Sequence, residues 1–239
     1  NLEKMLLHPS AASFSVPGSG KTSEGLCYWL CRKVEGEKLL VVLPKVGFIA
    51  WEDEFEAWIG WDSSKVVKLD VSGDSLLQKV ESSTEAEVFL ITYARLYHNV
   101  EQLSAVLEGG NWSMILDESH NIKNSKGAYS RAVRNVGSCA RRTKLILTGT
   151  PAPQGSKDLL AQVEFLRNAK MGIDESVDWI KQIKVRTTKN QLGLLETKTI
   201  LYCEPLPTSH QQLYKLLTSA AARNIEAGGN LEYASKLVN

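Results

Sequence analysis

The chain has 239 residues, which at roughly 100–200 residues per domain is enough for one large domain, or for one domain and part of another. Its hydrophobic content of 43% and charged content of 23% exclude a disordered, collagen-like or coiled-coil chain, and 28 basic against 27 acidic residues leave a formal charge of +1, so a nucleic-acid partner would have to bind a local basic surface. Because no run reaches the roughly 18 apolar residues of a membrane helix and the N-terminus lacks a signal-peptide pattern, we expect an intracellular protein without a membrane partner.

Short apolar runs alternate with helical patterns along the first two thirds of the chain. Six runs rich in Val, Ile and Leu predict buried strands at 12–16, 39–43, 66–69, 88–92, 114–116 and 145–147. The segments between them predict helices at 22–34, 49–59, 74–81, 99–107 and 125–136. This order predicts an α/β fold with a central, mostly parallel sheet and helices on both faces.

The pattern after residue 151 is mainly helical. Amphipathic spacing predicts helices at 156–168 and 176–183, followed by a last strand at 198–203 and a helix at 208–222. The sheet is therefore expected to be nearly complete before this part of the chain begins.

Four cysteines are too sparse for a disulfide framework and form no Cys-x-x-Cys pair: Cys27, Cys31, Cys139 and Cys203. We interpret them as reduced, buried thiols. The alternative is a metal site, since Cys27 and Cys31 lie four residues apart on a predicted helix and would present one face, but no histidine or second cysteine pair accompanies them.

The segment 15–22, SVPGSGKT, follows a predicted strand and opens a predicted helix. In that context Gly18 and Gly20 let backbone N–H groups turn toward phosphate oxygens, Lys21 brings a charge to the outer phosphates, and the Thr22 hydroxyl can bind Mg²⁺. The general phosphate-loop pattern has Gly where Ser15 stands, and the alternative is a plain Gly-rich turn. The predicted nucleotide-binding residues are Pro17, Gly18, Ser19, Gly20, Lys21, Thr22 and Ser23.

Two acids, Asp117 and Glu118, follow the apolar run at 114–116. The carboxyl ends of parallel strands meet at one edge of a sheet, where α/β proteins bind ligands. Asp117 is therefore predicted to bind the Mg²⁺ held beside Thr22, and Glu118 to orient and deprotonate a water. Alone, such a pair is usually a solvated turn; the phosphate loop upstream favours the functional interpretation.

The segment 145–151, LILTGTP, is another strand that ends in small hydroxylated residues. An ordinary turn is one interpretation. The other is that hydroxyls of the Thr148-Gly149-Thr150 segment hydrogen-bond His120, sense the γ-phosphate and couple chemistry to movement.

These three motifs, in this order, resemble motifs I, II and III of superfamily two helicases, and the rest of the chain is similar to the Swi/Snf branch of translocating ATPases. Further matching segments lie at 40–45 with Trp51, Glu54, Phe55 and Trp58 (motif Ia), 91–96 (motif Ib), 121–124, 158–160, 165–166, 185–189, 196–206 and 211–214. The resemblance implies a RecA-like P-loop ATPase lobe at 1–195, followed at 196–239 by a linker and the start of a second lobe.

The resemblance also implies a function: ATP and Mg²⁺ as cofactors, and translocation on double-stranded DNA. Lys21, Asp117, Glu118 and His120 would be the catalytic residues. The DNA face would contain Lys45, Thr92, Tyr93 and Arg95, although a solvated loop is the plain interpretation of Lys45. We expect weak or absent turnover, because the second lobe and its arginines, like the adenine-reading motif, are not found in this sequence.

Two other functions compete with the motor. A nucleotide-gated module that binds DNA or protein without processive movement would bind ATP tightly and turn it over slowly. A small-molecule kinase is disfavoured, because Thr-Gly-Thr-Pro and Asp-Glu-Ser-His are typical of motors.

Two further groups of residues have structural interpretations. Trp51, Phe55 and Trp58 repeat at helical spacing, which favours a buried stripe over base-stacking platforms. The basic run of Arg141, Arg142 and Lys144 is expected at a solvated sheet edge, with a DNA contact as the alternative.

Overall fold

The computed structural model describes residues 1–62, 64–193, 200, 202 and 207–226. The chain divides into two compact units, Asn1–Leu195 and Glu196–Asn239. In the second unit, the described part contains helix α10 (Thr208–Glu226), where the sequence predicts a helix at 208–222. The strand predicted at 198–203 and the thiol of Cys203 lie outside the described residues.

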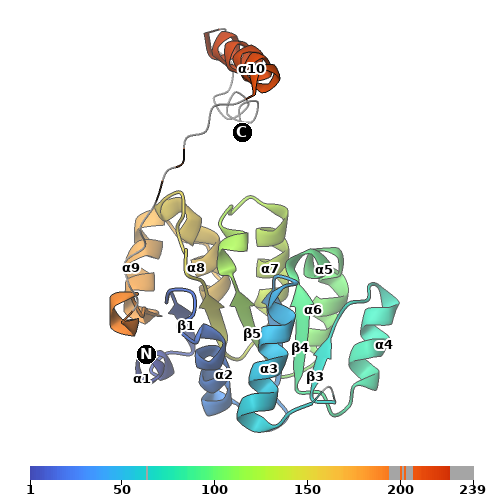
Figure 1. Cartoon of the computed structure of the whole chain (residues 1–239). Helices are drawn as coiled ribbons and strands as arrows, with labels where there is room; N and C mark the ends of the chain where they lie inside the picture. Colours follow the sequence, from blue (N-terminus) through green and yellow to red (C-terminus); the bar gives the residue numbers. More distant parts are fainter. Residues whose placement is uncertain (63, 194–199, 201, 203–206, 227–239) are drawn as a thin grey trace. The chain divides into compact units, whose positions relative to one another are not determined.

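The first unit is built on one sheet of seven parallel strands in the order β3-β4-β2-β5-β6-β1-β7 (Figure 1). The strands are β1 (Ser10–Ser13), β2 (Lys38–Leu43), β3 (Val66–Lys68), β4 (Val88–Thr92), β5 (Trp112–Asp117), β6 (Lys144–Leu147) and β7 (Lys184–Val185). Because every pairing is parallel, the loops that leave the carboxyl ends of these strands share one edge of the sheet.

Helices cover both faces of this sheet (Figure 1). One face carries α1 (Leu2–Leu6), α2 (Lys21–Arg32) and α3 (Gly47–Ile59). The other carries α4 (Asp74–Ser82), α5 (Tyr93–His98), α6 (Val100–Glu108), α7 (Ala128–Cys139), α8 (Leu160–Arg167) and α9 (Ile173–Ile183). Three short 3₁₀ turns complete the described elements: η1 (Ser119–Ile122), η2 (Ser156–Leu159) and η3 (Asn190–Leu192). None of the described helices is long and apolar enough to cross a membrane.

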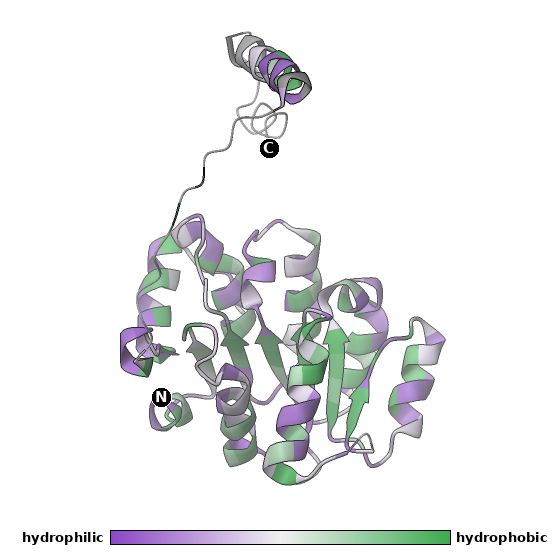
Figure 2. Ribbon diagram, in the orientation of Figure 1, coloured by the Kyte–Doolittle hydropathy of each residue, from purple (hydrophilic) through white to green (hydrophobic). Residues whose placement is uncertain are grey.

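The two faces bury separate hydrophobic cores, which explains the continuous apolarity of the strands (Figure 2). Along β2, Leu39, Val41 and Leu43 pack under the helices of one face, whereas Leu40 and Val42 pack under those of the other. A strand covered on both faces has no position at which a polar side chain reaches water. The predicted α/β fold with helices on both faces is confirmed.

Several boundaries differ from those predicted, for local reasons. Strand β1 covers Ser10–Ser13 instead of 12–16, and its two serines are accommodated because the Ser10 hydroxyl donates to the carbonyl of Leu166 (3.2 Å) and the Ser13 hydroxyl donates to Glu24. Helix α7 begins at Ala128 instead of 125, because Asn124 first forms a turn in which its side chain accepts the N–H of Lys126 (3.0 Å). Helices α1 and α5 and the two-residue strand β7 were not predicted.

Three side chains also depart from the sequence interpretation. Trp58 was expected in a buried stripe, but it is 62% exposed, while Trp51 and Phe55 are fully buried. Lys144 was expected at a solvated edge, but it is 2% exposed and donates to the carbonyl of Phe165 (3.1 Å). Cys31 is exposed, unlike Cys139, so the prediction of buried thiols does not hold for it.

Candidate nucleotide site and nucleic-acid face

The segment between β1 and α2 folds as a tight loop that wraps toward the N-terminus of α2. Gly18 and Gly20 have φ angles of +76° and +77°, in the left-handed region that other residues adopt only with strain. Gly20 is the N-cap of α2, and the N–H of Ser19 bonds to the carbonyl of Val16 (3.2 Å). The first N–H groups of α2 therefore open toward the concave side of the loop, as an anion site requires.

Ser15 stands where phosphate loops usually have glycine, and the structure gives its side chain a defined place. It is 1% exposed, and its hydroxyl accepts the N–H of Thr187 (2.9 Å), just beyond β7. The Ser15 hydroxyl oxygen also lies 3.2 Å from the hydroxyl oxygen of Ser13. The side chain thus anchors the start of the loop to the neighbouring edge of the sheet.

Two side chains of the loop have room for a partner. The Ser19 hydroxyl is buried and has no hydrogen-bond partner among the described residues, a costly state that an acceptor oxygen would relieve. The Lys21 ammonium lies folded on its own loop, 3.2 Å from the carbonyl oxygen of Val16. Thr22 follows it, half-buried, in the first turn of α2. The Ser23 hydroxyl is already used, since it donates to Glu54 on α3 (2.8 Å).

Asp117 ends β5 in a buried environment. Its carboxylate accepts the indole N–H of Trp51 (2.9 Å) and the backbone N–H of Glu118 (2.9 Å). Burial raises the pKa of Asp117; the Trp51 bond opposes this rise, the neighbouring Glu118 charge adds to it, and Lys21 lowers it. A carboxylate and a threonine hydroxyl both offer the hard oxygen atoms that Mg²⁺ accepts together with phosphate and water, so the donor types of Asp117 and Thr22 suit this ion. These residues therefore fit the metal.

Glu118 has a φ of +49°, which is uncommon for a residue with a side chain and marks a backbone held by its surroundings. Its carboxylate lies 3.1 Å from Nδ1 of His120, and the same nitrogen lies 3.0 Å from Oγ1 of Thr148 and 3.4 Å from Oγ1 of Thr150. The contact predicted between His120 and the two threonine hydroxyls is therefore present. Their role in coupling stays a prediction.

The turn after β6 also contacts the phosphate loop. A β-carbon on Gly149 would lie 3.0 Å from Cδ of Pro17, so this position has little room for a side chain. The N–H of Thr148 donates to the carbonyl of Ser13 (3.0 Å). The three predicted motifs thus lie together at the carboxyl edge of the sheet.

The residues predicted to face DNA have different surroundings. Lys45 and Arg95 are exposed, and Arg95 donates to Ser72 (2.6 Å). Thr92 caps α5 by accepting the N–H of Arg95 (3.2 Å).

Tyr93 is a correction to the predicted DNA face. It is 4% exposed, and its hydroxyl donates to the carbonyl of Asp117 (2.7 Å). Burial and the two nearby acids raise its pKa well above the ordinary value, so the hydroxyl stays protonated and remains a donor. The side chain of Tyr93 therefore holds the backbone of the acid pair, Asp117 and Glu118, and is not exposed to a ligand.

Two residues at the site were missed because their sequence patterns pointed elsewhere. Trp51 was interpreted only as core, yet a fully buried indole N–H needs an acceptor, and here it is Asp117. Tyr129 on α7 stacks on Tyr93, with ring centroids 6.5 Å apart. No local pattern predicts this second contact.

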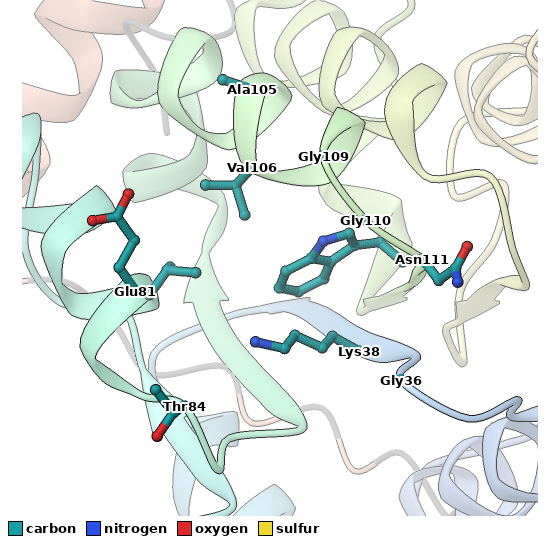
Figure 3. Close-up of a pocket in the computed structure, with 11 residues that line it drawn as sticks. Gly36, Lys38, Glu81, Thr84, Ala105, Val106, Gly109, Gly110 and Asn111 are labelled. Atoms are coloured by element: carbon teal, nitrogen blue, oxygen red, sulfur yellow. The ribbon is translucent and has the colours of Figure 1, made fainter.

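A separate pocket lies at the opposite edge of the sheet (Figure 3). It has a volume of about 510 Å³ and is lined by residues that include Lys38 at the start of β2, and by Glu81 and Gly110. Because it lies at the amino ends of the strands, it takes no part in the site built by the phosphate loop and the acid pair.

Comparison with known proteins places the sequence in a family. It matches the model of the SNF2-related domain over residues 17–228. It is 32% identical over 136 residues to the DNA repair and recombination protein RAD54B of Gallus gallus, covering 57% of this chain and 14% of that protein. It is 26% identical over 220 residues to the chromatin structure-remodeling complex subunit snf21 of Schizosaccharomyces pombe, covering 88% and 17%. The chain therefore spans less than a fifth of the length of these relatives.

Solved structures agree on the fold. The Sulfolobus solfataricus SWI2/SNF2 ATPase core in complex with dsDNA superposes with a TM-score of 0.60 at 20% identity, covering 97% of this chain and 52% of that one. The Pyrococcus furiosus Hef helicase domain gives 0.56 at 16% identity, covering 95% and 45%. The described sheet therefore has a RecA-like α/β fold. The chain belongs to the SNF2-related domain family, the Swi/Snf-type branch of the superfamily two helicase-like ATPases.

Proposed function

We propose that this chain is the ATP-binding motor lobe of a DNA-dependent ATPase that translocates on double-stranded DNA. The observation that carries the proposal is the meeting of two features at one sheet edge. One is a loop whose turn depends on the positive φ angles of Gly18 and Gly20, and in which the buried Ser19 hydroxyl has no hydrogen-bond partner among the described residues. The other is an acid pair whose second member, Glu118, is held beside His120 and Thr148. A loop that can bind phosphate and a carboxylate that can activate water therefore lie at the same edge of the sheet.

Each residue has a separate role in the proposed reaction. The N–H groups of the loop and of α2, together with Lys21, hold the phosphates, and Lys21 exchanges its bond to Val16 for them. Thr22 and Asp117 hold Mg²⁺. When bound, MgATP supplies the phosphoanhydride bond and the metal charge that offsets the developing negative charge. Glu118 orients a water and accepts its proton.

His120 is proposed as the link between hydrolysis and movement. One ring nitrogen lies within 3.4 Å of Glu118, Thr148 and Thr150. A change in the charge or position of Glu118 on hydrolysis would therefore reach the turn after β6, which packs against the phosphate loop at Gly149.

The proposed partners are the backbone of double-stranded DNA and a second RecA-like lobe, to which residues 196–239 would lead. Lys45 and Arg95 would contact phosphates, and Thr92 would orient the N-terminus of α5 toward them. Support comes from the family and from a relative named as a DNA repair and recombination protein. An intracellular location follows from a DNA partner.

The test is ATP hydrolysis by the 239-residue chain, by its Lys21→Ala variant and by a version carrying a second RecA-like lobe after residue 239, each with and without duplex DNA. We expect DNA-stimulated turnover in the two-lobed protein and its loss in Lys21→Ala. If the two-lobed protein binds ATP but its turnover never responds to DNA, the nucleotide-gated binding module replaces the motor.

A further inference from the structure

Three lysines line a pocket near the carboxyl edge of the sheet that the proposed nucleotide site does not use. Lys123 and Lys126 come from the loop between η1 and α7, and Lys157 comes from η2. The pocket has a volume of about 430 Å³ and is also lined by Asn124, Ser125 and Gln154. Three basic residues and several neutral polar residues therefore line this pocket.

The three lysines of this lysine pocket outnumber the one acid in its wall, Asp158. Within the described parts of the chain, none of the three lysines forms an ion pair with a carboxylate. The acid in the wall, Asp158, is 7% exposed and already accepts the N–H of Gln154 (2.8 Å). In a chain with a formal charge of only +1, this is a concentrated positive site.

The loop that supplies two of the lysines is held in place by its neighbours. The carbonyl of Asn124 accepts a bond from the Ser130 hydroxyl (2.5 Å), and the carbonyl of Lys126 accepts one from Arg131 (2.7 Å). Both donors belong to α7. A loop fixed in this way loses little conformational freedom when it binds a ligand.

The packing of α5 against α7 connects the lysine pocket to the proposed DNA face. Arg95 and Tyr97 lie on α5, which packs against α7. The rings of Tyr97 and Tyr129 lie 6.0 Å apart and are both exposed, and Tyr129 follows the lysine-bearing loop by three residues. A polyanion that contacts Arg95 can therefore continue over these rings to Lys126.

We propose that the lysine pocket binds a phosphate of the nucleic-acid backbone and extends the DNA face from α5 across α7 to η2. This inference rests on the proposed function. The connection to Arg95 favours nucleic acid, because a nucleic-acid backbone carries phosphates at regular intervals and can contact several basic sites in a row. An acidic protein segment could bind the lysine pocket without contacting Arg95. Lysines supply charge without base readout, so the contact would be independent of sequence.

The test measures the salt dependence of binding between the 239-residue chain and a fluorescent duplex by anisotropy, between about 50 and 200 mM salt. In B-DNA each phosphate that a protein neutralises adds about 0.9 to the steepness of log affinity against log salt. We expect a Lys123→Gln, Lys126→Gln, Lys157→Gln triple variant to have a slope that is shallower by about 1, the change that follows from losing one neutralised phosphate. Lys170→Gln is the matched control, because Lys170 is an exposed lysine outside the lysine pocket. It follows α8 by three residues and lies close in sequence to Asn168, which accepts a bond from Lys144 at the amino edge of the sheet.

A Lys45→Gln, Arg95→Gln double variant separates the two proposals. If the double variant binds duplex more weakly, but the triple variant has the same slope of log affinity against log salt as the wild type, the lysine pocket is not a DNA contact. The proposed function would still stand. If the wild type shows no salt-dependent duplex binding, both are wrong. If poly-glutamate binds at the lysine pocket and duplex does not, the pocket takes an acidic protein, which overturns the inference. Unchanged circular dichroism and urea unfolding show that the variants remain folded.

Discussion

The two acids that end β5 are neighbours in the sequence but have opposite surroundings. Asp117 is held by Trp51 and by a backbone N–H, and burial raises its pKa. Glu118 is more open, with a side chain that is 38% exposed beside His120. A fixed carboxylate suits a metal ligand, and a more open one suits a group that must meet water. Their environments therefore separate two roles that adjacent positions in the sequence do not distinguish.

Replacing Glu118 with Gln tests this division at a single residue. The amide keeps the size and one acceptor oxygen but cannot take a proton, so we expect ATP binding to be retained. Turnover should fall by about 10²–10⁴, the usual contribution of a general base. Equilibrium dialysis and phosphate release measure the two quantities. Glu101→Gln, at an exposed position on α6, is the control. Unchanged turnover in Glu118→Gln would remove Glu118 from the reaction.

Tyr93 is proposed to position the acid pair. Its hydroxyl donates to the carbonyl of Asp117, and it directly follows Thr92, which caps α5. Tyr93→Phe removes only that hydroxyl and leaves a buried acceptor, at a cost of about 1–3 kcal/mol in the free energy of unfolding. We expect the variant to keep its affinity for ATP and to lose DNA stimulation in the two-lobed protein.

The matched control for this change is Tyr97→Phe, because Tyr97 is 43% exposed on the same helix. Urea unfolding gives the stability, and phosphate release with and without duplex gives the stimulation. A Tyr93→Phe protein that is destabilised yet fully stimulated would make Tyr93 a purely structural residue.

At the scale of elements, the sequence predicts what depends on local pattern. The run Val88–Thr92 is continuously apolar and is found as β4 with the same bounds. Strand β7 has only two residues and forms because it pairs with β1, so its own sequence contains no pattern that predicts a strand. Helix α5 is six residues long and depends on its Thr92 cap. Short elements are set by their neighbours more than by their own residues.

The site divides in the same way. The phosphate loop, the acid pair and the 148–150 turn are local motifs at strand ends, so a parallel sheet brings them together. The Trp51 bond to Asp117 joins residues 66 positions apart, and the Tyr93–Tyr129 stack crosses two helices. Such contacts depend on packing, which spacing within one segment does not encode. The exposure of Trp58 also depends on packing, because the buried stripe of α3 continues from Trp51 and Phe55 to Ile59, which packs against the same core, and so leaves Trp58 outside it.

Lys144, at the start of β6, makes stability depend on pH. Burial lowers its pKa from the ordinary 10.5 to about 8. Between about pH 8 and 10.5 the folded chain then holds fewer protons than the unfolded chain, so this group makes stability rise with pH across that window. The rise is at most on the order of 3 kcal/mol, from about 1.4 kcal/mol per pH unit of difference.

Lys144→Met has no such group, so the stability of the wild type relative to this variant should increase between about pH 8 and 10. Urea unfolding at several pH values measures the difference, and Lys170→Met controls for removing an exposed lysine. A wild type and a Lys144→Met variant with parallel pH profiles would show that Lys144 titrates normally.

At the scale of the whole molecule, the two edges of the sheet have different uses. The amino edge holds Glu37, a buried carboxylate that accepts bonds from Trp29 (3.1 Å) and Arg142 (3.2 Å). These contacts join α2 to the segment before β6. The carboxyl edge holds the loops whose groups are still available. Stability and proposed function thus occupy opposite ends of the same strands.

The carboxyl edge also explains why one lobe should be a slow enzyme. The proposed phosphate loop, metal ligand and base all come from this lobe, but no arginine is among the residues we assign to the phosphates. An opposing arginine contributes about 10³–10⁵ in rate, so we expect the 239-residue chain to bind MgATP and to turn it over slower by about that factor than a two-lobed version. Single-turnover phosphate release from both proteins, at saturating ATP and duplex, measures the ratio. Equal rates, both abolished by Glu118→Gln, would mean that this lobe completes the reaction alone.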